Sequence, residues 1–216
     1  MQYTFQPNIK TVGNVSERFT TEQISTEQMI FSGDWNYTLE NAGPITRHVM
    51  GVLANTKEFR RAIAEGKNIV IDTRTNMLME GMYPSIPGWH CDDNIRGENG
   101  QPDPRLNTDD VQHFMCLLSD SEEPLARTSF VTEPFTVDLD EEDVWHSLDA
   151  AVNEQKPRVG FLSEGDIIRF SQSAIHEATL CKNKGWRFFF RASVTHRKPV
   201  NELRKQVQVY VTRNGW

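Results

Sequence analysis

The chain has 216 residues, a formal net charge of −7 and 38% hydrophobic residues. This length suits one domain of ordinary size, and the composition is that of a globular rather than a disordered protein. No apolar run is long enough to span a bilayer, and the first residues lack the pattern of a signal peptide. The acidic balance argues against nucleic-acid binding, which needs a basic face.

The three cysteines, Cys91, Cys116 and Cys181, are odd in number and form no CxxC pair. A disulfide framework or a cysteine metal site would show paired spacing. We therefore expect reduced thiols in a cytoplasmic protein with no membrane partner. These features leave the oligomeric state open.

The first half of the chain combines a helix with strands. A helix is expected over 44–65, where apolar residues recur near helical spacing between a proline suited to the first turn and Gly66. A strand is expected over 68–72, with 76–79 continuing the same sheet. Residues 94–110 are rich in Gly, Asn, Asp and Pro and predict a long loop, either a lid over a site or a surface insertion without a role.

Strands dominate the second half. They are expected over 111–118 and 126–131, with a further half-exposed strand over 207–211. The acidic run at 138–143 is expected to begin a helix, because acidic side chains suit a helix N-terminus. This pattern favours a mainly β protein with flanking helices, a sandwich or jelly-roll, in one domain spanning 1–216 with a mixed N-terminal extension over about 1–67.

Three consecutive strands near the C-terminus are the most informative stretch. They are expected over 165–170, 175–178 and 185–193. In the third strand, side chains alternate between faces, so Arg187 and Arg191 share a face while both faces carry aromatic residues. Two arginines in a strand buried on both sides need structural carboxylates, an anionic ligand or a wet cavity.

His90 and Asp92 stand two residues apart and, on a short strand, would point the same way. Of the six histidines, only His90 has a carboxylate two positions on, and His176 lies on a later strand. Mononuclear non-haem iron is commonly held by two His and one carboxylate. The two arginines come eleven and fifteen positions after His176, and arginine binds carboxylates through a two-pronged pair.

This order of residues resembles the Fe(II)/2-oxoglutarate-dependent dioxygenases. The segments 89–92, 165–170 and 175–176 are most similar to the phytanoyl-CoA hydroxylase-like branch, over about residues 80–195. The first 75 residues show no such similarity. The resemblance implies a double-stranded β-helix, in agreement with the jelly-roll expected from the strands, and an oxidoreductase that hydroxylates a small polar or anionic substrate while releasing succinate and CO2.

The resemblance also implies roles for single residues. His90, Asp92 and His176 would bind Fe(II). An Arg eleven positions past the second His commonly holds the far carboxylate of 2-oxoglutarate, which points to Arg187. Arg191 with Ser193 is similar to the Arg-x-Ser pair of other branches, so the choice between the two arginines stays open.

Further cosubstrate and substrate contacts are expected around this core. Thr128 or Ser129 would donate a hydrogen bond to 2-oxoglutarate. Trp89, Phe189 and Arg191 are candidates for substrate binding, and Phe114 and the loop 94–110 for the pocket and its lid, although aromatic strand residues mostly pack in cores. The chain departs from the branch at 122–125, where Glu-Glu-Pro-Leu stands in place of the usual Asn-Gly before Pro-Gly-Ser-His.

Two other interpretations remain open. A cupin-like metalloenzyme that does not use 2-oxoglutarate usually has a second His two positions after the first, where this chain has Asp92, and it has no need of Arg187 and Arg191. A non-catalytic jelly-roll binding or structural protein predicts that His90, Asp92 and His176 do not converge.

Overall fold

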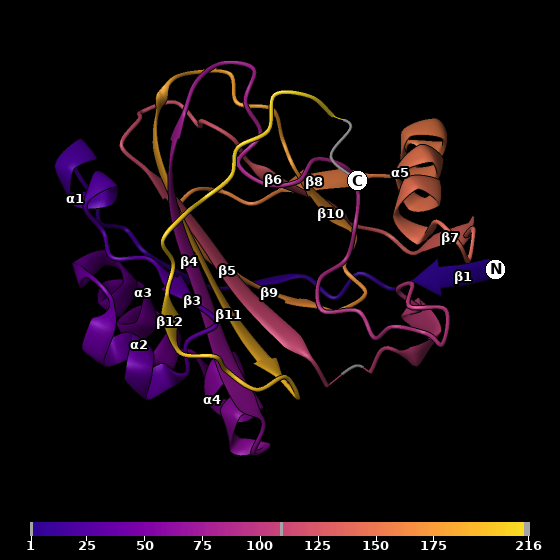
Figure 1. Cartoon of the computed structure of the whole chain (residues 1–216), viewed down its shortest axis with the longest axis horizontal. Helices are drawn as coiled ribbons and strands as arrows, with labels where there is room; N and C mark the ends of the chain where they lie inside the picture. Colours follow the sequence, from indigo (N-terminus) through magenta and orange to yellow (C-terminus); the bar gives the residue numbers. More distant parts are fainter. Residues whose placement is uncertain (1, 109, 214–216) are drawn as a thin grey trace.

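Two antiparallel β-sheets form the centre of the molecule in the computed structural model, which describes residues 2–108 and 110–213 (Figure 1). The larger sheet has the strand order β2-β9-β5-β11-β4 and the smaller one β10-β6-β8. The larger sheet consists of β2 (Lys10–Asn14), β9 (Asp166–Ser171), β5 (Gln112–Ser119), β11 (Gly185–Thr195) and β4 (Asn68–Leu78). The smaller sheet consists of β10 (His176–Ala178), β6 (Thr128–Val131) and β8 (Val159–Phe161).

The strand β11 organises the larger sheet because it pairs with β4 along its whole length and with β5 on its other side. Its residues alternate between the two faces of the sheet. Phe188 and Phe190 belong to the core on the outer face. Arg187, Phe189 and Arg191 have the opposite parity and line a cavity.

Four helices cover the outer face of the larger sheet, on the left in Figure 1. Their apolar residues, such as Val49 and Leu53, pack with Phe114 and Phe188 in the largest hydrophobic cluster. These helices are α1 (Thr21–Ser25), α2 (Trp35–Asn41), α3 (Pro44–Ala54) and α4 (Lys57–Ala64).

A second cluster joins the two sheets: Met115 and Leu117 of β5 and Phe170 of β9 pack with Phe130 of β6. On the other side of β6, Val131 packs with Leu148 in a third cluster. That cluster is built from α5 (Val144–Gln155), β7 (Phe135–Asp138) and its partner β1 (Gln2–Phe5). The molecule therefore has separate apolar clusters on the outer face of the larger sheet, between the two sheets and beside α5.

The C-terminal segment returns across the molecule, in yellow in Figure 1. Its strand β12 (Glu202–Leu203) pairs with β3 (Ile30–Phe31), and Tyr210 forms an isolated bridge with Tyr83. Within the described ranges no helix could cross a bilayer, given its length and polarity. All three cysteines are buried free thiols.

The prediction of a mainly β protein with flanking helices is confirmed, as are the three C-terminal strands. The single helix over 44–65 is wrong: the Thr56 hydroxyl accepts a hydrogen bond from the Phe59 N–H and starts α4 as a separate helix. Gly66 does follow that helix with a φ of +75°. The acidic run precedes α5 instead of starting it, with Asp143 as the residue before the helix.

Two predicted strands are also wrong. Over 207–211 only Tyr210 pairs, because no neighbouring strand runs beside the rest of that stretch. At the candidate site, His90 forms one isolated bridge instead of lying in a strand with Asp92. The loop over 94–110 contains only the short 3-10 helix η1 (Pro104–Leu106) and a bridge between Arg96 and Pro102; residue 109 lies outside the described residues.

Candidate metal centre

His90, Asp92 and His176 come together from two distant segments of the chain. The His90 N–H donates to the His176 carbonyl at 3.0 Å, and the His176 N–H donates back at 2.9 Å. Gly88, with a φ of +107°, turns the chain just before this bridge, a conformation that residues with a Cβ rarely adopt. One potential ligand atom from each of the three side chains lies within 4.8 Å of the other two.

The two imidazoles are oriented by backbone carbonyls. His90 Nδ1 lies 2.8 Å from the Gly88 oxygen, and His176 Nδ1 lies 2.9 Å from the Ala174 oxygen. Because a carbonyl only accepts hydrogen bonds, Nδ1 carries a proton in both rings, which leaves Nε2 as the atom through which each histidine can bind a metal. Burial, followed by the proximity of His176, lowers the pKa of His90 to about 4 and keeps it neutral.

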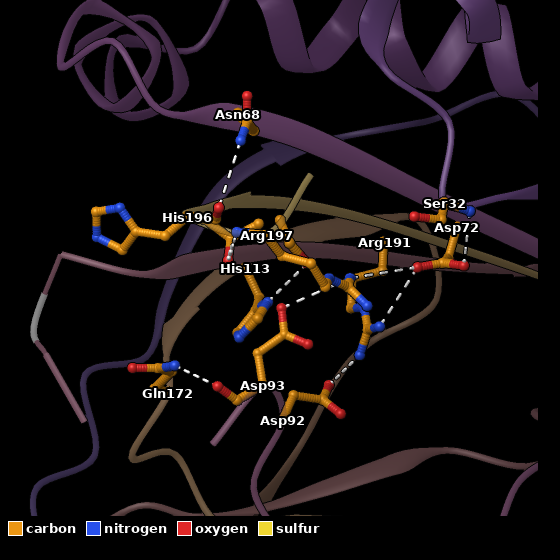
Figure 2. A network of polar contacts seen from close by, with 12 residues as sticks. Ser32, Asn68, Asp72, Asp92, Asp93, His113, Gln172, Arg191, His196 and Arg197 are labelled. Atoms are coloured by element: carbon orange, nitrogen blue, oxygen red, sulfur yellow. Dashed lines mark hydrogen bonds and ion pairs between the residues drawn. The ribbon is translucent and has the colours of Figure 1, made fainter. Parts of the chain in front are cut away.

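The carboxylate of Asp92 is held in its ionised form. Burial by itself would raise its pKa, but the charge of Arg191, followed by the proximity of His176, outweighs that effect and brings the pKa well below its usual range. Arg191 Nη1 lies 2.5 Å from Asp92 Oδ2, and Nη2 lies 3.5 Å from Asp72 Oδ2. Figure 2 shows this guanidinium between the two aspartates. The buried positive charge of Arg191 is thus paired with a carboxylate on each side.

The three residues line a cavity of about 380 Å³. That volume is within the range of small-molecule sites, roughly 300–1,000 Å³. Apolar groups such as Phe189 and Met115 share the wall with Thr128 and with four arginines and two aspartates. The charged residues of the wall are Arg74, Arg96, Arg187, Arg191, Asp92 and Asp93.

Arg187 is buried in this wall without a carboxylate partner among the described residues. Its side chain is 5% exposed, and its Nε donates to the Ala126 carbonyl at 3.2 Å. Burial, followed by the nearby charge of Arg74, lowers its pKa to about 10. An arginine remains charged at neutral pH even so, and its Nη groups are the natural partners of a ligand carboxylate.

The other predicted cosubstrate residues are placed differently. Arg191 lines the cavity, but both of its partners are aspartates of the protein itself. The Ser193 hydroxyl is buried and lies 2.9 Å from His113 Nδ1, away from the cavity wall. Thr128 is part of the wall, whereas its neighbour Ser129 is not.

Of the residues expected on the substrate side, Phe189 lines the cavity. Trp89 does not: it packs in the third hydrophobic cluster beside α5. Phe114 faces the helices on the outer side of the larger sheet and is not a pocket residue either. The loop 94–110 contributes Asn94, Arg96 and Pro102 to the wall.

Sequence reasoning missed two charged residues near the site, Asp72 and Arg74. Both lie in β4, which was expected to be interrupted after Asp72. The alternation of polar residues in this segment is the signal that could have identified them. Asp72, Arg74 and Asn76 occupy every second position and therefore share one face of the strand. The register of β4 with β11 places them opposite Arg191, Phe189 and Arg187.

No protein-family model matches the chain, and no curated protein matches it significantly. The class of site is therefore judged from the possible metal ligands themselves, His90, Asp92 and His176. Two imidazoles and one carboxylate beside a cavity are typical of non-haem Fe(II) sites with positions left for ligands. His90, Asp92 and His176 thus form a group that could hold a metal ion.

Proposed function

We propose that the chain is an Fe(II)/2-oxoglutarate-dependent oxygenase that hydroxylates a small molecule. One observation carries the proposal: the His90-Asp92-His176 group shares its cavity with Arg187, a buried arginine that has no carboxylate partner among the described residues. A metal group and an unpaired cation in one cavity match a cosubstrate that chelates iron at one end and carries a carboxylate at the other.

The position of this arginine favours 2-oxoglutarate over other anions. Arg187 stands eleven positions after His176 and has no carboxylate partner in the described part of the chain, while the charge of Arg191 is met by Asp92 and Asp72. This matches the order seen in the dioxygenases that the sequence resembles. Two facing antiparallel sheets with an apolar core between them also agree with a double-stranded β-helix.

Each residue of the site has a defined task in this proposal. His90 and His176 offer Nε2, and Asp92 offers a carboxylate oriented by Arg191. Arg187 and Thr128 bind and orient 2-oxoglutarate, and Phe189 and Met115 keep water out of the cavity. When bound, iron and 2-oxoglutarate supply oxygen activation, with succinate and CO2 as products and one oxygen atom transferred to the substrate.

The test is an anaerobic titration of the Fe(II)-loaded protein with 2-oxoglutarate, following the visible charge-transfer band of the chelate. We expect the band in the wild type and no band in His176→Ala. His146→Ala is the matched control, because His146 is exposed on α5 and far from the triad in sequence. That variant should give the wild-type band.

The same titration separates the three functional interpretations. Metal binding without the band, in folded protein, would indicate a cupin-like metalloenzyme that does not use 2-oxoglutarate. Failure to bind Fe(II), Mn(II) or Ni(II) at all would indicate a non-catalytic protein. Either result contradicts the proposal.

A further inference from the structure

Arg74 is a second cavity arginine without a carboxylate partner among residues 2–108 and 110–213. It lies in β4 opposite Phe189 of β11, and its guanidinium carbon lies 5.6 Å from the centre of that ring. Its Nε is buried and has no hydrogen-bond partner. Arg187 lies over the same ring at 5.9 Å, so two guanidinium groups share one aromatic surface.

The protein environment opposes the charge of Arg74. Burial, followed by the positive charges of Arg204 and Arg191, lowers its pKa. Asn76, next along the same face of β4, is also buried, and both polar atoms of its amide lack a partner. Burying a polar group without a partner is unfavourable, so an arginine with a purely structural role should have a carboxylate beside it, as Arg191 has.

The charge of the cavity wall exceeds what the proposed cofactors neutralise. Four arginines and two aspartates leave a formal excess of two positive charges. Iron(II) adds two more and the 2-oxoglutarate dianion removes two, so the same excess remains with both bound. This cationic wall stands in a chain whose formal net charge is −7. A further anion would balance the occupied cavity.

We infer that Arg74 binds an oxyanion, a carboxylate or a phosphate-like group, on the substrate that is oxidised. The inference rests on the proposed function and identifies the class of its substrate. Arg96 is the other arginine of the wall that could bind this anion, but it is exposed and already donates to the Gly100 carbonyl at 2.6 Å. Arg74 is the deeper and less satisfied of the two, and it therefore takes the anion.

The first arm of the test measures 2-oxoglutarate affinity by the charge-transfer band in three variants. Arg187→Met should weaken binding by about 10- to 100-fold, because it removes a charge-assisted pair. Arg74→Met should change it by less than about threefold. Arg61→Met, at an exposed position of α4, is the control for loss of an arginine elsewhere.

The second arm uses sulfate and acetate as probes, titrated by calorimetry into protein loaded with Mn(II) and 2-oxoglutarate. Sulfate represents a phosphate-like group and acetate a carboxylate. We expect one of them to bind the wild type and the Arg61→Met control, and to bind Arg74→Met at least about tenfold more weakly. Arg74→Lys keeps the charge and should recover part of the affinity.

The outcomes are distinct from those of the functional proposal. Loss of 2-oxoglutarate affinity in Arg74→Met equal to that in Arg187→Met would make Arg74 a cosubstrate residue and overturn the inference while leaving the oxygenase intact. Anion affinity unchanged in Arg74→Met, or no anion binding by the loaded wild type, would overturn it too. Absence of the band in the wild type would instead contradict the oxygenase itself. Circular dichroism of each variant establishes that it is folded.

Discussion

At the level of single residues, the metal centre depends on one guanidinium held between two carboxylates. Arg191 contacts Asp92 on one side and Asp72 on the other, and Asp72 also accepts from Arg204 at 2.8 Å. The arrangement fixes the rotamer of Asp92 before any metal arrives. Groups that orient a ligand in this way contribute to metal affinity without touching the metal.

We predict that Arg191→Met weakens Fe(II) binding by about 10- to 100-fold, because Asp92 loses its orienting partner. Competition with a chromophoric chelator measures the affinity. Arg191→Lys keeps a charge but not the two-pronged geometry, so its Fe(II) affinity should lie between those of the wild type and Arg191→Met.

Arg197→Met is the matched control for this prediction. Arg197 is 44% exposed and reaches Asp72 and Asp93 only at 3.9 and 3.6 Å, so its loss should change the metal affinity little. An Arg191→Met protein that is folded and binds Fe(II) as tightly as the wild type would show that Asp92 needs no orientation.

At the level of elements, strands that the local sequence marks could be predicted, whereas strands that depend on a distant partner could not. The strands over 166–171, 176–178 and 185–195 were predictable because turn residues and apolar side chains mark them locally. The stretch 207–211 has the same alternation but pairs only at Tyr210. Whether an alternating segment becomes a strand depends on a neighbour that lies far away in sequence.

The candidate site likewise has residues that the local sequence indicates and residues whose roles depend on distant pairing. His90, Asp92 and His176 could be proposed from spacing and order, and the structure brings them together. Arg187 and Arg191 could not be told apart, because the difference lies in Asp72, whose contact with Arg191 depends on the register of β4. The position of Trp89 outside the cavity could not be predicted, because its local sequence does not indicate that it packs in the cluster beside α5.

We predict that Asp34→Ala lowers the free energy of unfolding by about 0.5–2 kcal/mol at pH 7, because Asp34 caps α2 by accepting from the Tyr37 N–H at 2.8 Å. Its carboxylate also accepts from the Asn201 side chain at 2.9 Å and so links α2 to the C-terminal segment. Urea denaturation of both proteins measures the difference.

The effect should depend on pH. The Tyr37 backbone hydrogen bond, followed by that from Asn201, lowers the pKa of Asp34. A lowered pKa means that the stabilisation is fully present above the unfolded value of about 3.9 and is lost as the pH falls through the folded value. The gap between wild type and Asp34→Ala should therefore narrow below about pH 4. A gap that stays constant down to pH 2 would show that the charge of Asp34 contributes nothing.

At the level of the whole molecule, an acidic chain surrounds a cationic cavity. The formal net charge is −7, whereas the wall of the cavity has two arginines more than aspartates. At 0.15 M salt the Debye length is about 8 Å, so a ligand in the cavity senses the wall far more than the distant surface. At 0.01 M it is about 30 Å, and the whole surface acts on an approaching ion.

This contrast has a kinetic consequence. An anion such as 2-oxoglutarate must cross a repulsive outer field before it reaches the attractive wall, so its association rate constant should rise by a factor of about 2–5 when salt is increased from 10 to 150 mM. Stopped-flow measurement of chelate formation tests this, and a rate that falls with salt would contradict it. In Arg74→Met the salt dependence should persist, because it arises from the surface. The exterior thus slows the arrival of anions, and the cavity determines how long each one stays.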